Sequence, residues 1–285
     1  MDHAIPMPAS LAWRLLAAPR RGVERLHPDP RIPGYRVLRE LGTGRRSSAW
    51  LARDEASGGE VVLKLQPSGG ALLHREWEIA ATLQGEHVLR VHDHGRAGAW
   101  AYLVMEHAPG GDLSQRMRAP VPASQALALL RQAALGLAQL HRRGWVHRDV
   151  KPANFLLRAD GSLVLADFGL AARAGQCAAG LQQGAVTGTP RYVAPELLQG
   201  APASPAADVY SLGVLLHEML CGRPPFNGET LMEILSQHLL AAPPRLPSAL
   251  AELQPLVDRM LAKEVQCRLP DADAVLGLLG PRCMS

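Results

Sequence analysis

Two short polar stretches constrain this chain more than any other feature of its sequence. The first is HRDVKPANFLL, which begins at His147, and the second is ADFG. They contain Asp149, Lys151, Asn154 and Asp167, with 13 residues from Asn154 to Asp167. Either stretch alone occurs by chance. Both together, in this order and at this spacing, predict one site built from the four polar side chains.

These four residue types suit the transfer of the terminal phosphoryl group of ATP. That reaction needs positive charge around a phosphate, metal ions held by oxygen ligands, and an acceptor oriented in line with the breaking bond. Asp149 would orient the attacking hydroxyl, and Lys151 would neutralise charge on the transferred phosphate. Asn154 and Asp167 would supply the hard oxygen ligands that Mg²⁺ prefers, with Mn²⁺ as an alternative.

Lysine usage points to the same chemistry. Of 30 basic residues only three are lysine, namely Lys64, Lys151 and Lys263, and the other 27 are arginine. A bias of this kind replaces lysine wherever either residue will serve. A compact ammonium and a broad planar guanidinium are not equivalent at a crowded phosphate site. Two of the three remaining lysines stand at expected phosphate-binding positions.

Composition excludes several functional classes. The 285 residues suffice for one large or two small domains, and an apolar content of 47% provides a core. The net charge of +4 comes from scattered basic residues without a dense run, which argues against nucleic-acid binding. The four cysteines are far apart and show no CxxC spacing, so we expect reduced thiols rather than zinc or disulfides (Cys177, Cys221, Cys267 and Cys283).

No segment has the pattern of a membrane span or a secretion signal. Apolar runs stay below the ~18–20 residues that a span requires, and LAWRLLAA near the N-terminus is interrupted by Arg14. Residues 1–33 form a Pro- and Arg-rich extension in which Ser10 would cap a short helix before Pro19. We interpret this extension as a tail or packed strap rather than a membrane-surface or partner-binding helix. We expect a cytoplasmic location.

The hydrophobic pattern predicts an α+β fold with two lobes. Alternating segments with glycine turns predict antiparallel strands over YRVLREL, SSAWLARDE, EVVLKLQ, VLRVHDHGR and AYLVMEH, with one main helix over HREWEIAATLQ. Helical periodicity then dominates, including SQALALLRQAALGLAQLHRRG, DVYSLGVLLHEMLCG and ALAELQPLVDRMLA, and two short strands flank Asn154 and Asp167. The expected parts are an extension (1–33), a domain (34–280) with a small lobe (about 34–106) and a large lobe (about 109–280), and a tail (281–285).

Over about residues 35–280 these segments resemble the protein kinase superfamily, specifically the eukaryotic-like Ser/Thr kinases of bacteria. The resemblance implies a protein kinase fold, with a small sheet lobe joined to a large helical lobe. It also implies transfer of the γ-phosphate of ATP to Ser or Thr of protein substrates, including the enzyme itself. DVKPAN carries Lys151 two residues after Asp149, which matches the Ser/Thr-type pattern. The sequence indicates neither the physiological substrate nor an oligomeric state.

The resemblance assigns residues around the ATP phosphates. LGTGRRSSAW resembles the glycine-rich loop, in which Gly42 and Gly44 let backbone N–H groups approach phosphate oxygens. Ser47 stands where the family often has a third glycine. VVLK resembles the strand whose lysine, Lys64, holds the α- and β-phosphates.

A glutamate on the following helix is expected to pair with Lys64. Glu76 and Glu78 are both candidates. Glu76 lies seven residues before the apolar Leu83, which is the spacing that the resemblance implies, so we choose Glu76 as the catalytic partner.

The resemblance also implies an adenine pocket with two exchanged side chains. Ala49 and Val62 reverse the sizes that are usual in the family, a swap that roughly conserves volume, so ATP is expected to fit. The remaining positions implied for the nucleotide are Leu41 and Leu156 around the base, the gatekeeper Met105, the backbones of Glu106 and Ala108 at the adenine edge, and Asp112 near the ribose.

AVTGTPRYVAPE resembles the segment that positions the peptide substrate, together with the APE motif that anchors this segment to the large lobe. Three structural interactions follow from this resemblance. They are Thr189 with Asp149 and Lys151, Glu196 with Arg268 as a buried ion pair, and Asp208 with the backbone around His147 and Arg148.

Other functions remain as alternatives. A pseudokinase scaffold usually lacks one of the key residues, whereas Lys64, Asp149, Asn154 and Asp167 are all present. A small-molecule phosphotransferase of related fold lacks the GTPRYVAPE segment. The histidines His74, His87, His92 and His94 also suggest a metal site, although surface or packing roles are favoured.

Regulation is constrained by what the activation loop lacks. Between Phe168 and Val186 the chain has no Ser, Thr or Tyr, so mid-loop phosphorylation cannot activate it. Candidate controls are Thr187, the N-terminal extension and an activating partner, with Cys177 as a redox candidate that we interpret as inert. The last expected helix ends near residue 280, so we expect no attached sensor domain or membrane anchor.

Overall fold

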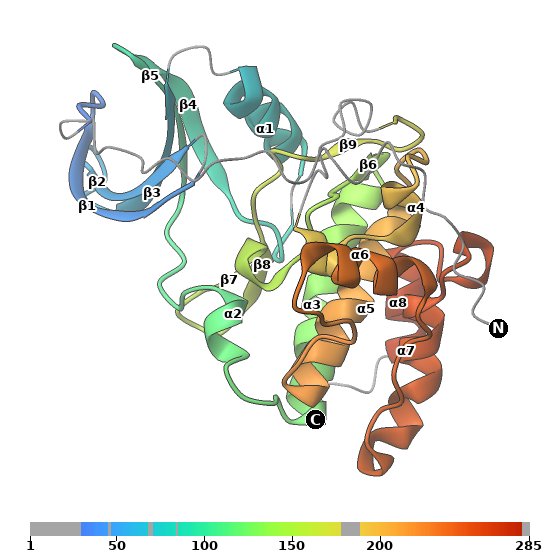
Figure 1. Ribbon diagram of the computed structural model, residues 1–285. Coiled ribbons are helices and arrows are strands. Elements are labelled where there is room, and N and C mark those ends of the chain that lie inside the picture. The colour runs from blue at the N-terminus through green and yellow to red at the C-terminus, as the bar shows by residue number, and fades with distance from the viewer. Residues whose placement is uncertain (1–29, 45–46, 68–70, 84, 178–188, 281–285) are drawn as a thin grey trace.

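The segments with alternating apolar residues, from Tyr35 onward, form an antiparallel sheet. The structure, a computed structural model, describes residues 30–44, 47–67, 71–83, 85–177 and 189–280. The strands are β1 (Tyr35–Thr43), β2 (Ser48–Asp54), β3 (Glu60–Pro67), β4 (Val91–Ala97) and β5 (Trp100–Glu106), in the order β1-β2-β3-β5-β4. The helix α1 (Ala71–Thr82) packs against β4 and β5 (Figure 1).

The period of two along β3 separates its structural residues from those that face the rest of the molecule. Val61, Leu63 and Leu65 are buried in one apolar cluster of the sheet. Because successive side chains of a strand point to opposite faces, Val62 and Lys64 lie on the other face. Val62 packs there against a second apolar cluster that includes residues of the helical part.

The segment before β4 joins the sheet to the helical part. A strand was expected from Val88, but β4 begins at Val91. The residues before it pair instead with the helical part, where the Leu89 amide donates to the Leu165 carbonyl at 2.9 Å. The Leu165 amide in turn donates to the His87 carbonyl at 3.0 Å. The tertiary partner therefore decides where this strand begins.

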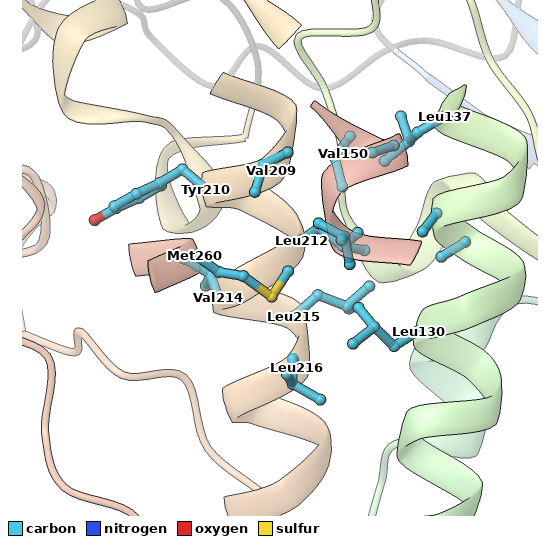
Figure 2. Packing of buried hydrophobic residues seen from close by; sticks show 14 of the residues in the cluster. Leu130, Leu137, Val150, Val209, Tyr210, Leu212, Val214, Leu215, Leu216 and Met260 are labelled. Atoms are coloured by element: carbon cyan, nitrogen blue, oxygen red, sulfur yellow. The ribbon is translucent and has the colours of Figure 1, made fainter. Parts of the chain in front are cut away.

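The second part is mostly helical and surrounds one buried helix (Figure 1). Its helices are α2 (Leu113–Arg116), α3 (Ala123–His141), α4 (Pro195–Leu198), α5 (Pro205–Cys221), α6 (Leu231–Leu240), α7 (Gln254–Leu261) and α8 (Ala272–Leu279). Almost every residue of α5 is buried, because apolar side chains occur all around it. Leu212 and Leu215 of α5 point toward Leu130 and Leu137 of α3 (Figure 2).

One predicted helix is shorter than its periodicity suggested. ALAELQPLVDRMLA was expected to be continuous, but Ser248–Leu253 is a 3₁₀ helix and α7 begins at Gln254. Pro255 lies in the first turn of α7, where its missing N–H leaves no hydrogen bond unmade. None of the helices in the described ranges combines the length and apolar character needed to cross a membrane.

Short strands between α3 and α4 carry the polar residues of interest. The hairpin of β7 (Phe155–Leu157) and β8 (Leu163–Leu165) is antiparallel, and β6 (Trp145–Val146) pairs with β9 (Ala172–Arg173). The pairs are anchored on buried residues of the helical core, including Val146, Phe155 and Leu165. The two polar stretches identified in the sequence lie at the ends of these strands.

Candidate active site

The β7–β8 hairpin explains the spacing between Asn154 and Asp167. Asn154 directly precedes β7, and Asp167 follows β8 by two residues. Phe155 pairs with Leu165, and the Ala166 amide donates to the Asn154 carbonyl at 2.8 Å. The two ends of an antiparallel hairpin lie side by side. The fold therefore brings Asn154 and the Asp167 segment together at one edge.

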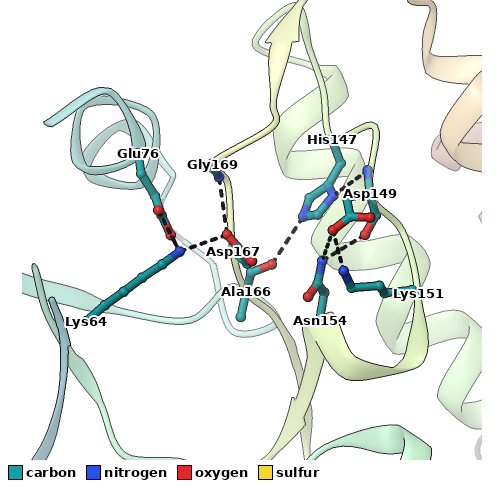
Figure 3. Close-up of polar contacts among 9 residues, drawn as sticks. All are labelled: Lys64, Glu76, His147, Asp149, Lys151, Asn154, Ala166, Asp167 and Gly169. Carbon is teal, nitrogen blue, oxygen red and sulfur yellow. Dashed lines mark hydrogen bonds and ion pairs between the residues drawn. The ribbon is translucent and has the colours of Figure 1, made fainter. Parts of the chain in front are cut away.

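Asp149 is held by three neighbours in a buried position. Its Oδ2 accepts hydrogen bonds from Lys151 Nζ at 2.6 Å and from Asn154 Nδ2 at 3.1 Å (Figure 3). Its Oδ1 accepts from the backbone N–H and the hydroxyl of Thr189, at 3.0 and 3.1 Å. Three side chains and one backbone N–H thus determine the orientation of this carboxylate.

A buried carboxylate, that of Asp208, accepts hydrogen bonds from the backbone just before Asp149. Asp208 at the start of α5 accepts the amide N–H groups of His147 at 2.7 Å and Arg148 at 2.8 Å. The His147 ring lies 3.1 Å from the Ala166 carbonyl, which links the two polar stretches. Arg148 and Asp167 have positive φ angles of 66° and 63°. Such backbone is strained in residues other than glycine and is maintained by surrounding contacts, as at many functional sites.

Lys64 forms an ion pair with α1 and a second with Asp167. Its Nζ lies 2.8 Å from both carboxylate oxygens of Glu76 and 2.8 Å from Asp167 Oδ1 (Figure 3). Of the two glutamate candidates, Glu76 is therefore the one that contacts Lys64. The Glu78 side chain is 58% exposed and lies 3.4 Å from His74.

Lys64, Glu76 and Asp167 shift one another's pKa values. Burial alone would lower the pKa of Lys64, but the carboxylates of Glu76 and Asp167 raise it above its ordinary value. Burial raises the pKa of Glu76, against the effect of the Lys64 ammonium. For Asp167 burial also acts upward, but the Lys64 ammonium holds its pKa below the ordinary value. Lys64 is thus a permanent cation next to an ionised Asp167.

Four of the predicted adenine-site residues lie together. Val62, Met105, Ala108 and Leu156 belong to one apolar cluster between the sheet and the β7–β8 hairpin. The backbone N–H and C=O of Ala108 make no hydrogen bond among the described residues. An unpaired donor and acceptor beside an apolar surface suit the edge and face of a planar base.

The residues predicted to cover the nucleotide lie on β1 and β2. Ala49 pairs with Gly42 on one side and with Lys64 on the other. Leu41 is 40% exposed and does not contribute to the apolar cluster. Gly44 donates its amide N–H to the Ser47 carbonyl at 2.7 Å, and the loop tip between them lies outside the described residues.

Glu106 and Asp112 use their side chains for contacts within the protein. The Glu106 amide donates to the Arg90 carbonyl at 3.0 Å, so only its carbonyl is left for a base. The Glu106 carboxylate pairs with Arg158 at 2.8 Å. Asp112 caps α2 by accepting the Gln115 amide at 3.2 Å. Both acidic side chains therefore stabilise the connection that borders the apolar cluster.

The donor set at Asn154 and Asp167 fits a divalent cation. Asn154 donates Nδ2 to Asp149, which leaves its Oδ1 without a partner among the described residues. Asp167 uses Oδ1 for Lys64 and Gly169, and its Oδ2 likewise has no partner in the described ranges. Two free oxygens, one of them anionic, match the ligand preference of Mg²⁺.

One predicted contact is wrong. Thr189 was expected to bond both Asp149 and Lys151, but in the described structure it bonds only Asp149. Lys151 reaches Asp149 itself, because the opposite charge attracts the ammonium more strongly than a neutral hydroxyl does. The expected Glu196–Arg268 pair and the expected bracing by Asp208 are both present.

The histidine-rich surface of the sheet is an aromatic stack. The Trp77 ring stacks on His94 with centroids 3.8 Å apart, and His74 lies 5.4 Å from His94. In the described ranges no three His, Cys, Asp or Glu residues are grouped so that they could hold a metal ion. The rings of His74, Trp77 and His94 therefore pack against one another.

Two arginines bond the activation segment through side-chain contacts that the sequence did not indicate. Arg75 on α1 donates to the Ala171 carbonyl at 2.9 Å, and Arg148 donates to the Leu170 carbonyl at 2.7 Å. Burial and the neighbouring Arg75 lower the pKa of Arg148. The contacts join residues 96 and 22 positions apart, so no local pattern could have revealed them.

Comparison with known proteins agrees with this geometry. The protein kinase domain family matches residues 35–276. The chain is 35% identical over 256 residues to the serine/threonine-protein kinase drp72 of Corynebacterium efficiens, covering 85% of this chain and 49% of that protein. It is 37% identical over 237 residues to PknL of Mycobacterium tuberculosis, covering 80% of this chain and 59% of the relative. The chain thus spans about half the length of the curated relatives it matches. It belongs to the protein kinase domain family, and the relatives it matches are named serine/threonine-protein kinases.

Proposed function

We propose that this kinase transfers the γ-phosphate of Mg·ATP to Ser or Thr hydroxyls of proteins, itself included, with Asp149 orienting the acceptor. The observation that carries the proposal is the position of Asp149, whose carboxylate is held by Lys151, Asn154 and Thr189. Transfer of labelled γ-phosphate to the protein itself and to a basic Ser/Thr substrate tests it. Physiological substrates and an activating partner remain predictions, as does the cytoplasmic location.

The side chains divide the reaction between them. Asp149 accepts the hydrogen bond of the attacking hydroxyl and holds it in line with the terminal phosphate. Lys151, which contacts Asp149, would neutralise charge on the transferred group. Asn154 and Asp167 would hold Mg²⁺, which neutralises charge on the phosphate oxygens when bound. Lys64 would hold the α- and β-phosphates, with Glu76 setting its direction.

The apolar cluster of Val62, Met105, Ala108 and Leu156 is the proposed adenine site. The free backbone groups of Ala108 would bond the edge of the base, together with the Glu106 carbonyl. The exchange of sizes between Ala49 and Val62 keeps the roof volume roughly constant. Leu41, Gly42, Gly44 and Asp112 would complete the nucleotide site around the phosphates and ribose.

Replacing Lys64 by Met is expected to lower kcat/KM for ATP by about 10²–10³-fold, because one preorganised positive charge at the phosphates is lost. Steady-state kinetics with varied ATP measures the effect, with urea unfolding as a check on the fold. The Lys64→Arg variant is the matched control for charge. We expect it to remain impaired, because a planar guanidinium cannot reproduce the compact contact with Glu76 and Asp167. Activity of Lys64→Met close to that of the wild type would contradict this role.

Activity is expected to be independent of phosphorylation in the middle of the activation loop, over residues 169–185. In many kinases a phosphate pairs with the arginine equivalent to Arg148. Here Arg148 and Arg75 already donate to the Leu170 and Ala171 carbonyls. Residues 169–185 offer no hydroxyl to modify. The rate after phosphatase treatment should therefore equal the rate before it.

The comparison uses purified protein with phosphate content measured by mass spectrometry. A fall of about tenfold or more after dephosphorylation would contradict the prediction. The Thr187→Ala variant would then show whether Thr187, which lies outside the described residues, is the switch. Cys177 is exposed and free, and its proposed inertness predicts equal rates with and without reductant.

A further inference from the structure

The third lysine of the chain, Lys263, lies in the helical part rather than at the phosphate site. It follows α7 by two residues and is half-buried. Its Nζ donates to the carbonyls of Gln237 at 3.2 Å and His238 at 2.7 Å, and to the Tyr210 hydroxyl at 3.0 Å. These carbonyls belong to the last turn of α6, where a cation is favourable, and the Gln237 carbonyl also accepts the Ala241 amide at 3.0 Å. All three N–H donors of the ammonium are therefore used.

The contacts of Lys263 continue in one direction through two buried side chains. Because Lys263 can only donate, the Tyr210 hydroxyl accepts from it and its own proton is free to donate. That proton points to His238 Nδ1, 3.0 Å away. The opposite nitrogen, Nε2, faces the Arg191 carbonyl at 3.1 Å and must therefore carry a hydrogen. In this series of contacts, Lys263 Nζ, the Tyr210 hydroxyl, both ring nitrogens of His238 and the Arg191 carbonyl each have a partner.

The protonation of His238 agrees with this pattern. Burial and the Lys263 ammonium lower the pKa of His238 to about 4, so its ring is neutral at physiological pH. Burial and the nearby Arg268 guanidinium lower the pKa of Lys263 to about 7, whereas its three acceptors favour the protonated form. The Phe226 ring, 3.9 Å from Nζ, adds a cation–π contact.

The end of this chain of contacts is the segment next to Asp149. Arg191 lies in the 3₁₀ helix Pro190–Tyr192, which begins directly after Thr189. Thr189 donates twice to Asp149, and the Tyr192 amide donates back to the Thr189 carbonyl at 3.0 Å. The segment is therefore bonded to Asp149 at Thr189 and to His238 at the Arg191 carbonyl.

We propose that Lys263, Tyr210 and His238 are positioning residues that hold the segment Thr189–Tyr192 in register for a peptide substrate beside Asp149. The inference rests on the proposed role of Asp149 as the residue that orients the acceptor. This role also explains why position 263 is lysine in a chain whose other basic residues are almost all arginine. The Arg268 guanidinium already lies beside Tyr210, 4.9 Å from the ring centroid. A second planar guanidinium, at position 263, would not direct three donors to the three acceptors of Lys263.

The same helical part offers a matched control. His217 of α5 is also almost fully buried, and its Nδ1 lies 3.2 Å from the Arg223 carbonyl. Burial lowers the pKa of His217 as well. Its carbonyl partner belongs to the turn after α5 rather than to the segment beside Asp149. Replacing His217 by leucine removes one ring hydrogen bond to a carbonyl, whereas replacing His238 removes two, and only His238 contacts the proposed substrate segment.

The test compares His238→Leu, His238→Gln, Tyr210→Phe and His217→Leu in the full chain. Each variant is assayed for peptide KM, ATP KM, kcat and the free energy of unfolding in urea. We expect His238→Leu and Tyr210→Phe to raise the peptide KM by about tenfold, as expected for loss of about one hydrogen bond, with ATP KM unchanged. His238→Gln, which keeps an N–H donor, should recover part of the loss. His217→Leu, which also removes a hydrogen bond of a buried histidine, should leave the peptide KM unchanged.

Hydrogen–deuterium exchange over residues 189–192 provides a readout that does not need catalysis. Exchange there should accelerate in His238→Leu and not in His217→Leu. Absence of phosphoryl transfer by the wild-type protein would overturn the proposed function but leave this exchange test intact. An unchanged peptide KM and unchanged exchange in His238→Leu would overturn the positioning role, as would equal changes in both leucine variants.

Discussion

Asp149→Asn is expected to lower kcat by about 10²–10⁴-fold while leaving the affinity for ATP unchanged. The substitution keeps the shape of the side chain but replaces an anionic oxygen by an NH₂ group. Lys151 and Asn154 both donate to Oδ2, and Thr189 donates twice to Oδ1. An amide at either position turns a donor toward donors and can no longer accept the proton of the attacking hydroxyl.

The measurement is transfer of labelled γ-phosphate from Mg·ATP, to the protein itself and to a basic Ser/Thr peptide, beside nucleotide binding by titration. Asp160→Asn is the matched control, because Asp160 is exposed in the turn between β7 and β8 and lies outside the site. Transfer that survives in Asp149→Asn would exclude Asp149 from the chemistry. A wild-type protein that binds nucleotide without transferring phosphate would instead support the scaffold alternative.

Glu196→Ala is expected to lower the free energy of unfolding by about 3–5 kcal/mol. Arg268 is buried and uses all five of its N–H donors. Two of them pair with Glu196 at 2.7 and 3.0 Å. The other three donate to the carbonyls of Ala262, Ala206 and Lys263. Removing the carboxylate leaves a buried guanidinium without its counter-charge, and water cannot replace it in a packed position.

Urea unfolding measures this loss, and the Arg142–Asp273 pair supplies the comparison. Both partners of that pair are about half exposed, so Asp273→Ala should cost about 1 kcal/mol or less. Replacing Glu196 by Leu and Arg268 by Met together should restore much of the stability, since no buried charge then remains unpaired. Equal losses for Glu196→Ala and Asp273→Ala would show that the buried pair contributes no more than a surface pair.

Much of the site could be predicted because its residues are close in sequence. Asp149, Lys151 and Asn154 lie on one loop, and a single hairpin brings Asp167 beside them. Local geometry alone therefore places them. The start of β4 and the break before α7 were mispredicted for different reasons. Val88 and Leu89 pair with the helical part instead of the sheet, and Pro255 begins a new helix inside a continuous apolar pattern.

Contacts across long sequence separations were inferred only where the family resemblance supplied them, as for Glu196 with Arg268. Arg158 reaches Glu106, and Arg75 reaches the activation segment, through contacts that no local pattern indicates. The path from Lys263 to Arg191 passes through three helices and belongs to the same class. Such contacts depend on how helices pack, and packing is a property of the whole core.

The sequence by itself determined the family of the protein and most of its strands and helices, because hydrophobic periodicity and motifs at short spacing specify them. Only the tertiary structure decided which groups are satisfied. It gave Lys151 to Asp149 rather than to Thr189, surrounded Lys263 with acceptors, and paired Lys64 with Glu76, the glutamate already chosen from the sequence. The physical reason is that a buried charge or polar group is stable only with a partner, and that partner is chosen by the packed fold.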